Sequence, residues 1–179
     1  MINFIIKQRG PIINYFGFSV VWICCASTPA LEMPLLAPIV TIIFLLLHFS
    51  IIAYNRDKEL KLIIFSVLLG IVVDSGFAIM NIVQYNGVIS ALPNFAPIWI
   101  LCMWAGFASQ VNYAMKYLKG KYPLIGFYGL LAPLAYIGGE KINAVTIMPE
   151  NSSYIIISCL LYTSPSPRDL STSRMPSSA

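Results

Sequence analysis

Long apolar stretches follow one another along this chain, and they constrain its fold more than any other feature. A helix needs about 20 mainly apolar residues to cross the hydrocarbon core of a bilayer. Five stretches approach or exceed this length, and a sixth begins near residue 153. The five run approximately over residues 11–28, 35–54, 60–83, 97–118 and 122–139. The sequence therefore predicts an all-α, polytopic transmembrane helix bundle with five complete spans and the start of a sixth.

The composition excludes two other classes of protein. Hydrophobic residues make up 58% of the chain and charged residues only 10%, whereas a soluble domain carries about 25% charged residues. A water-soluble fold is therefore excluded. The formal net charge of +4 is spread over a mostly apolar chain and forms no basic face, so we expect no nucleic-acid partner. The expected partners are the lipid bilayer and a lipid or a second membrane protein.

The last segment, residues 159–179, differs in composition from everything before it. It begins Cys-Leu-Leu-Tyr-Thr-Ser-Pro-Ser-Pro-Arg-Asp and ends Ser-Arg-Met-Pro-Ser-Ser-Ala. Both strings resemble the translation of a common sequencing adapter. We expect residues 159–179 to be a non-native, disordered tail, and residues 1–158 to be a transmembrane domain that is truncated in its sixth span. The alternative is a native Ser/Pro-rich tail.

The basic residues predict the orientation of the bundle. Before residue 159, eight of the nine Lys and Arg residues fall in alternate segments: before the first stretch, between the second and third, and around the end of the fourth. They are Lys7, Arg9, Arg56, Lys58, Lys61, Lys116, Lys119 and Lys121. By the positive-inside rule, the N-terminus and these segments are cytoplasmic.

Small residues recur every three or four positions in the third, fourth and fifth stretches. In lipid, such stripes allow helices to approach closely. We therefore expect the three helices to pack together. The stripes contain Ser66, Gly70, Ala78, Ala105, Ser109, Gly129, Ala132 and Gly139.

Asp74 is an acidic residue within the third stretch. A rise of about 1.5 Å per residue from Leu60 places it about 21 Å across the bilayer, in the outer half. An intramembrane acid costs about 2.5–3.5 kcal/mol on insertion scales, so it is usually paired and often functional. Lys141 is expected to reach inward as an ion-pair partner, and Tyr136 to donate a hydrogen bond. A packing ion pair and a functional site both fit this pattern.

A second polar pair is predicted nearer the cytoplasmic face. His48, the single histidine, falls in the second stretch at a depth similar to that of Asn112 in the fourth. The two form either a proton-handling pair or an interhelical hydrogen bond. Because His48 and Asp74 lie in opposite halves of the membrane, they are not expected to form one acid–base pair.

The sequence lacks the usual catalytic and metal-binding motifs. It has no His-x-x-x-His, no Cys-x-x-Cys, no glycine-rich phosphate loop and no Gly-x-Ser-x-Gly. We therefore expect no metal and no cofactor.

An ordered set of residues resembles the bacterial inner-membrane family called domain of unknown function 2878. The set covers most of residues 10–147. It comprises Asn14, Trp22, Cys24, His48, Gly70, Asp74, Pro97, Trp99, Trp104, Phe107, Ala108, Asn112, Pro133, Tyr136, Gly138 and Lys141. Ala132 stands where the family pattern has glycine. The resemblance implies an integral inner-membrane protein of Gram-negative bacteria, with a link to membrane-lipid metabolism.

Two functions follow as hypotheses. The first is a small non-enzymatic membrane protein, either an accessory subunit or a transporter-like bundle, in which Asp74 and Lys141 pair between helices. The second is a membrane-embedded lipid-modifying enzyme or lipid-binding module, in which Asp74 accepts a proton beside Tyr136 or Lys141.

Overall fold

The computed structural model describes residues 2–118, 120–121, 133–148 and 156–157. Most of these residues lie in helices, as expected. The helices are α1 (Ile2–Ser27), α2 (Leu36–Leu47), α3 (Arg56–Ile79), α4 (Ile98–Gln110) and α6 (Pro133–Lys141). Two short helical turns, η1 (His48–Ile52) and η2 (Lys116–Leu118), extend α2 and follow α4.

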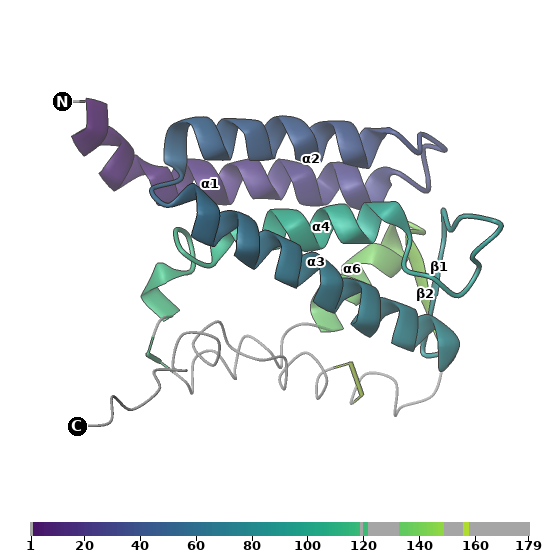
Figure 1. The fold of residues 1–179 in the computed structure, drawn as a ribbon. Helices are drawn as coiled ribbons and strands as arrows, with labels where there is room; N and C mark the ends of the chain where they lie inside the picture. Colours follow the sequence, from purple (N-terminus) through teal and green to yellow (C-terminus); the bar gives the residue numbers. More distant parts are fainter. Residues whose placement is uncertain (1, 119, 122–132, 149–155, 158–179) are drawn as a thin grey trace, which may run out of the picture.

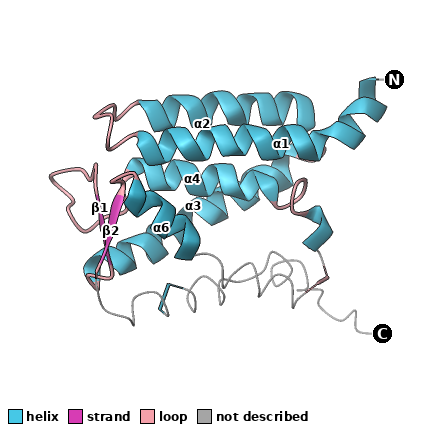
Figure 2. Ribbon diagram, turned by 180° about the vertical axis from the view of Figure 1, so that it is seen from behind, coloured by secondary structure: helices cyan, strands magenta, loops and turns pink. Residues whose placement is uncertain are grey.

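α1, α2 and α4 lie side by side, and α3 packs against α4 at an oblique angle (Figure 1). α4 contacts α1, α2 and α3. One end of the bundle contains the end of α2, the start of α3 and the end of α4; we call it the η1 end. The other end contains the β-strands and is called the β end (Figures 1 and 2).

The start of α3 has a clear local cause. The Asn55 side chain caps the helix by accepting the backbone N–H of Lys58 at 3.2 Å. Asp57 and Glu59 lie in the first turn, where negative charge is favourable. α3 ends at Ile79, and Asn81 adopts a positive φ of 53° that turns the chain out of the helix.

A two-stranded antiparallel sheet departs from the all-α expectation. Strand β1 (Val83–Tyr85) pairs with β2 (Val145–Ile147), with Gln84 opposite Thr146. Each strand alternates buried, exposed, buried. This period of two suits a half-buried strand, but three residues are too short for the pattern to stand out in the sequence.

The expected spans also differ in length from the helices. The third stretch, 60–83, is α3 followed by β1, and the fourth, 97–118, is a 13-residue α4 followed by turns and η2. By length and composition, two helices in the described part of the chain can cross a membrane: Gly10–Ser27 and Arg56–Ile79. Two shorter apolar helices cover Leu36–Ile52 and Ile98–Gln110.

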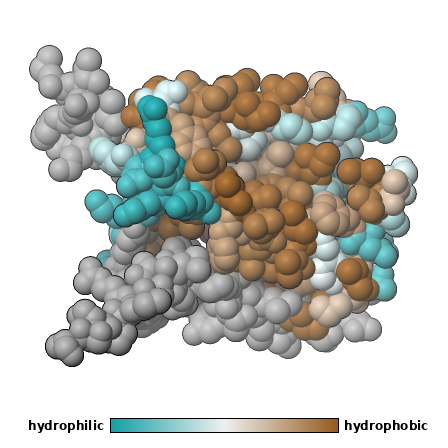
Figure 3. Space-filling view, in the orientation of Figure 1, coloured by the Kyte–Doolittle hydropathy of each residue, from teal (hydrophilic) through white to brown (hydrophobic). Residues whose placement is uncertain are grey.

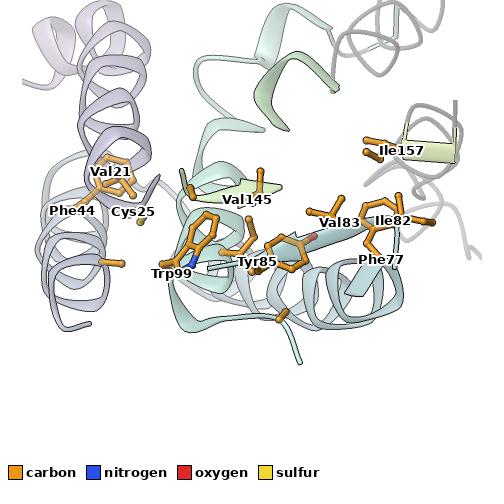
Figure 4. Packing of buried hydrophobic residues seen from close by; sticks show 14 residues of the cluster. Val21, Cys25, Phe44, Phe77, Ile82, Val83, Tyr85, Trp99, Val145 and Ile157 are labelled. Carbon is orange, nitrogen blue, oxygen red and sulfur yellow. The ribbon is translucent and has the colours of Figure 1, made fainter. Parts of the chain in front are cut away.

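The main apolar core joins the helices to the sheet. Phe77 from α3, Trp99 from α4 and Tyr85 from β1 are all buried in it. Figure 4 shows these side chains together with Val21 and Cys25 of α1. The core therefore fixes β1 and β2 against the β end of the bundle.

Candidate functional site

Both buried acids of the described chain lie on α3. Its buried residues form one stripe of Glu59, Ile63, Ser66, Gly70, Asp74 and Phe77. Glu59 and Asp74 are 15 positions apart, or about 22 Å along the helix axis. α3 therefore places one carboxylate at each end of the bundle.

Asp74 is fully buried at the β end and accepts three side-chain hydrogen bonds. Tyr85 Oη donates to Oδ1 at 2.6 Å, and Tyr136 Oη donates to the same oxygen at 2.8 Å. Trp104 Nε1 donates to Oδ2 at 2.6 Å. We call these four residues the Asp74 cluster. Because the donors come from β1, α4 and α6, the carboxylate ties three separate elements to α3.

Close packing keeps the Trp104 indole in place. Gly70 lies one turn before Asp74 on α3, and a Cβ atom at this position would overlap the Trp104 ring. The hydroxyl of Ser66 also donates to the Trp104 backbone carbonyl at 3.3 Å. The small residues on the α3 stripe therefore bring the indole within reach of Asp74.

Tyr85 remains protonated in this setting. Burial, and then the negative charge of Asp74, raise the pKa of the Tyr85 phenol well above its ordinary value near 10. The phenol therefore acts as a hydrogen-bond donor across the physiological pH range.

The sequence predicts two partners of Asp74, Tyr136 and Lys141, and the structure contains one of these contacts. Tyr136 does donate to the carboxylate. Lys141 is exposed at the end of α6, and it forms no ion pair with Asp74 within the described ranges. The ion-pair expectation is therefore wrong here, because neutral donors satisfy the carboxylate in place of a cation. Tyr85 and Trp104 were not predicted as partners, since nothing local in the sequence links either residue to position 74.

His48 lies fully buried at the η1 end, in a single turn of π-helix. Such turns are frequent at functional sites. Asn14 Nδ2 donates to His48 Nδ1 at 3.2 Å, and His48 Nε2 lies 3.0 Å from Glu59 Oε2. Because Nδ1 is the acceptor, the ring proton lies on Nε2 and is donated to Glu59. Thus His48 joins α1 to α3.

Glu59 extends this network toward the turns after α4. Its other oxygen, Oε1, accepts the Tyr113 hydroxyl at 2.6 Å, and that hydroxyl accepts the Tyr54 backbone N–H at 3.0 Å. The His48 and Tyr113 rings meet edge to face at 5.1 Å. We call Asn14, His48, Glu59 and Tyr113 the His48 cluster.

Asn14 is fully buried but incompletely hydrogen-bonded. Its backbone carbonyl accepts Gln110 Nε2 at 2.9 Å, and its Nδ2 also reaches Ser109 Oγ at 3.4 Å. Its side-chain oxygen, Oδ1, has no hydrogen-bond partner. An unsatisfied buried acceptor costs about 1–3 kcal/mol. The cluster therefore contains an acceptor beside His48 that can receive a further donor.

The expected partner of His48 was Asn112. The hydrogen-bond partners seen for His48 are Asn14 and Glu59, and Asn112 lies on the wall of a nearby cavity. Sequence reasoning missed Glu59 because it precedes the apolar stretch that begins at residue 60. Extending the α3 stripe by seven residues from Ser66 would have found it.

Other residues of the expected packing stripes also lie at contacts. Ala105 and Ser109 are buried on α4, and Ala78 packs against the main core. Gly139 is buried against Val145 of β2. Gly129 and Ala132 lie outside the described residues.

A cavity of about 330 Å³ opens beside the His48 cluster. Glu59 and Tyr113 reach it from the cluster, and two lysines lie on its wall. Its lining is Gly10, Pro11, Ile52, Tyr54, Asn55, Lys58, Glu59, Asn112, Tyr113 and Lys116. This combination of lysine, amide and hydroxyl groups suits an anionic, oxygen-rich ligand.

Metal binding has no support in the described segments. They contain no group of three or more His, Cys, Asp and Glu residues placed to hold an ion. Cys24, Cys25 and Cys102 are free thiols in this part of the chain.

The family model described as "Protein of unknown function (DUF2878)" matches residues 11–163. The chain belongs to this family. The match covers α1 from Pro11 onward, both clusters and every cavity residue except Gly10. No curated protein and no solved structure shows significant similarity to the chain.

Proposed function

We propose that this protein is a non-enzymatic, transporter-like or accessory bundle of the bacterial inner membrane, which binds an anionic lipid headgroup at its cytoplasmic end. The observation that carries the proposal is the cavity beside Glu59, whose wall includes Lys58 and Lys116. The binding site is thus distinct from the intramembrane acid Asp74. The link to lipid also agrees with the membrane-lipid context that the family resemblance implies.

Exposed apolar surface supports insertion into a bilayer. Large aliphatic and aromatic side chains point outward along α1, α2 and α3, for example Phe16 at 64%, Leu46 at 62% and Val72 at 71% exposure. Figure 3 shows continuous apolar surface over the bundle, with hydrophilic residues gathered toward its ends. An apolar surface of this extent is typical of contact with lipid rather than water.

The basic residues support the orientation. Arg56, Lys58, Lys61 and Lys116 all belong to the η1 end. Under the positive-inside rule, this end is cytoplasmic and the β end faces outward. The cavity then opens at the height of the lipid headgroups.

Lys58 and Lys116 on the cavity wall indicate that the proposed ligand is anionic. An ammonium group near the surface of an anionic membrane contributes about 1 kcal/mol to binding. Lys58 and Lys116 come from α3 and η2, so a phosphate between them would bridge two elements. Asn55 and Asn112 offer amide groups on the same wall.

The alternative, a lipid-modifying enzyme that uses Asp74, has less support. A proton acceptor needs an oxygen within reach of its substrate. Asp74 is 0% exposed, and both of its oxygens already accept hydrogen bonds from protein side chains. The geometry favours a structural role for the Asp74 cluster.

Lipid binding tests the proposal directly. The chain is placed in nanodiscs of phosphatidylcholine, and phosphatidylglycerol is titrated in. Replacing two lysines, Lys58→Gln with Lys116→Gln, should weaken binding about tenfold or more. Lys61→Gln is the matched control, since Lys61 is an exposed lysine of α3 outside the cavity wall. Equal affinity in the double variant and the control would contradict the proposal.

Topology is tested separately. Reporters that fold only in the cytoplasm, or only outside it, are inserted after Asn55 and in the segment 88–95 between β1 and α4. The cytoplasmic reporter should be active at Asn55 and the external one in 88–95. The reverse pattern would overturn the orientation.

A further inference from the structure

We infer that the His48 cluster is a proton-binding site, and that proton binding there is linked to ligand binding in the adjoining cavity. The linkage rests on the proposed function; the proton site does not depend on it. The bound species is a proton, which is carried by the imidazole of His48. Three observations carry the inference: the contacts of both ring nitrogens, the unpartnered Asn14 oxygen, and the position of Glu59 on the cavity wall.

The two ring nitrogens have different partners. Nε2 donates its proton to Glu59 Oε2, and Nδ1 accepts from Asn14 Nδ2. In this arrangement the imidazole is neutral and the Glu59 carboxylate is negative. On the imidazole, a further proton can be added only at Nδ1, because Nε2 already carries one.

Asn14 is able to accommodate this second proton. A half-turn of its side-chain amide exchanges Nδ2 and Oδ1, which brings the oxygen to the place facing Nδ1. The oxygen then accepts Nδ1–H, while Nε2–H continues to donate to Glu59. No other polar side chain has to move. The oxygen gains Nδ1–H as its donor, while Nδ2 takes the place in which the oxygen had no partner, so one group of the amide is unpaired in either state.

The Glu59 carboxylate can compensate the positive charge of a protonated His48. The groups facing His48 are Asn14 from α1, Glu59 from α3, Tyr113 after α4, and Phe44 and Phe49 from its own segment. Among these residues, Glu59 is the only one that carries a charge at neutral pH. Proton uptake changes the His48–Glu59 pair from a net charge of −1 to zero.

This change in charge creates the link to the cavity. Glu59 lies on the cavity wall, so an anionic ligand there is repelled by the unprotonated pair and less so by the protonated pair. Ligand binding therefore favours proton uptake, and by reciprocity a lower pH favours ligand binding. Coupling between such sites is typically about fivefold or more in affinity.

Nitrogen NMR can observe the proton directly, because the chain has one histidine. The chain is labelled with ¹⁵N-histidine, purified without a histidine tag and placed in phosphatidylcholine nanodiscs. At pH 8 the spectrum should show a neutral ring with its proton on Nε2. On acidification toward pH 5 it should convert to imidazolium while the protein stays folded. A ring that remains neutral in the folded protein would overturn the proton site.

Glu59→Gln tests the charge partner. It should lower the imidazolium fraction at a given acidic pH, whereas Asp57→Asn, an exposed acid in the same helical turn, should leave it unchanged. Equal behaviour of the two variants would contradict the role of Glu59.

A second arm tests the linkage. Phosphatidylglycerol should bind the wild-type chain about fivefold more tightly at pH 5.5 than at pH 8, and Glu59→Gln should flatten this dependence. If phosphatidylglycerol does not bind at either pH while His48 still titrates, the proposed function fails and the proton site stands. If it binds equally at both pH values, the linkage fails.

Discussion

The two acids of α3 lie in opposite surroundings. Asp74 accepts hydrogen bonds from three neutral side chains and lies within a closed core. Glu59 pairs with the only histidine of the chain, reaches a cavity, and belongs to a cluster that includes an unpartnered oxygen. Both oxygens of Glu59 are also hydrogen-bonded, so the two acids differ in their access to a cavity and in the charge of their partners rather than in hydrogen bonding. Burial alone therefore does not identify the functional acid.

The largest effect on stability is expected from Asp74→Ala. The substitution leaves Tyr85, Trp104 and Tyr136 without their acceptor and should cost about 3 kcal/mol of unfolding free energy. Asp57→Ala, at an exposed position of the same helix, is the control. Unfolding in a denaturing detergent measures both. A cost as small as that of the control would show that the cluster does not hold the β end together.

Gly70→Ala should have the next largest effect. The added methyl group overlaps the Trp104 indole and displaces it from Asp74, at a cost of about 2 kcal/mol. Gly76→Ala lies six positions on in α3, and its Cβ would meet nothing within 4 Å. This control should raise stability by about 0.5 kcal/mol, since alanine favours a helix. Equal effects at both positions would rule out close packing at Gly70.

The sequence predicts the α3 stripe better than it predicts the partners of Asp74 and His48. The α3 stripe is periodic, so Gly70, Asp74 and the packing of the helices follow from sequence spacing. The partners of Asp74 do not, because β1, α4 and α6 meet only in the folded chain. Similarly, Asn14 and Glu59 are 45 positions apart and share His48 through tertiary contacts.

The helix boundaries show a second limit of sequence reasoning. Hydropathy indicated a stretch over 97–118, yet α4 ends at Gln110. Ser109 and Gln110 are buried at the end of α4. Ser109 donates to the Gly106 carbonyl within α4, and Gln110 donates to the Asn14 carbonyl of α1, so polar contacts occupy positions where a continuous apolar helix was expected. Windowed hydropathy does not register such contacts.

Tyr85→Phe should have a smaller, pH-dependent effect. At neutral pH the loss of one hydrogen bond costs about 1 kcal/mol, because Tyr136 still donates to the same oxygen. Burial raises the pKa of Tyr85 in the folded chain, so the unfolded chain loses this proton first. The contribution of Tyr85 is therefore complete below pH about 10 and declines above it. The variant should show a shallower alkaline decline in unfolding experiments; an unchanged slope would contradict this contribution.

The smallest cost is expected from Glu59→Gln, below about 1 kcal/mol. The glutamine oxygen can keep one of the two hydrogen bonds, and water in the cavity can solvate the amide. Asp74→Asn is the matching change at the fully buried end, where the amide must fit between the donor-only Trp104 N–H and two phenol hydroxyls that have to reorient to accept. The cost at Asp74 should exceed the cost at Glu59 in the same detergent assay. The opposite order would reverse the comparison between the two clusters.

Lipid affinity measured per folded protein tests the central claim most directly. Asp74→Asn and the double variant of Lys58→Gln and Lys116→Gln are each compared with the wild-type chain for binding of phosphatidylglycerol in nanodiscs. The account predicts that folded Asp74→Asn binds within about twofold of wild type, whereas the double variant loses about tenfold or more. Loss of binding in folded Asp74→Asn, with affinity retained in the double variant, would place the site at Asp74 and contradict the account.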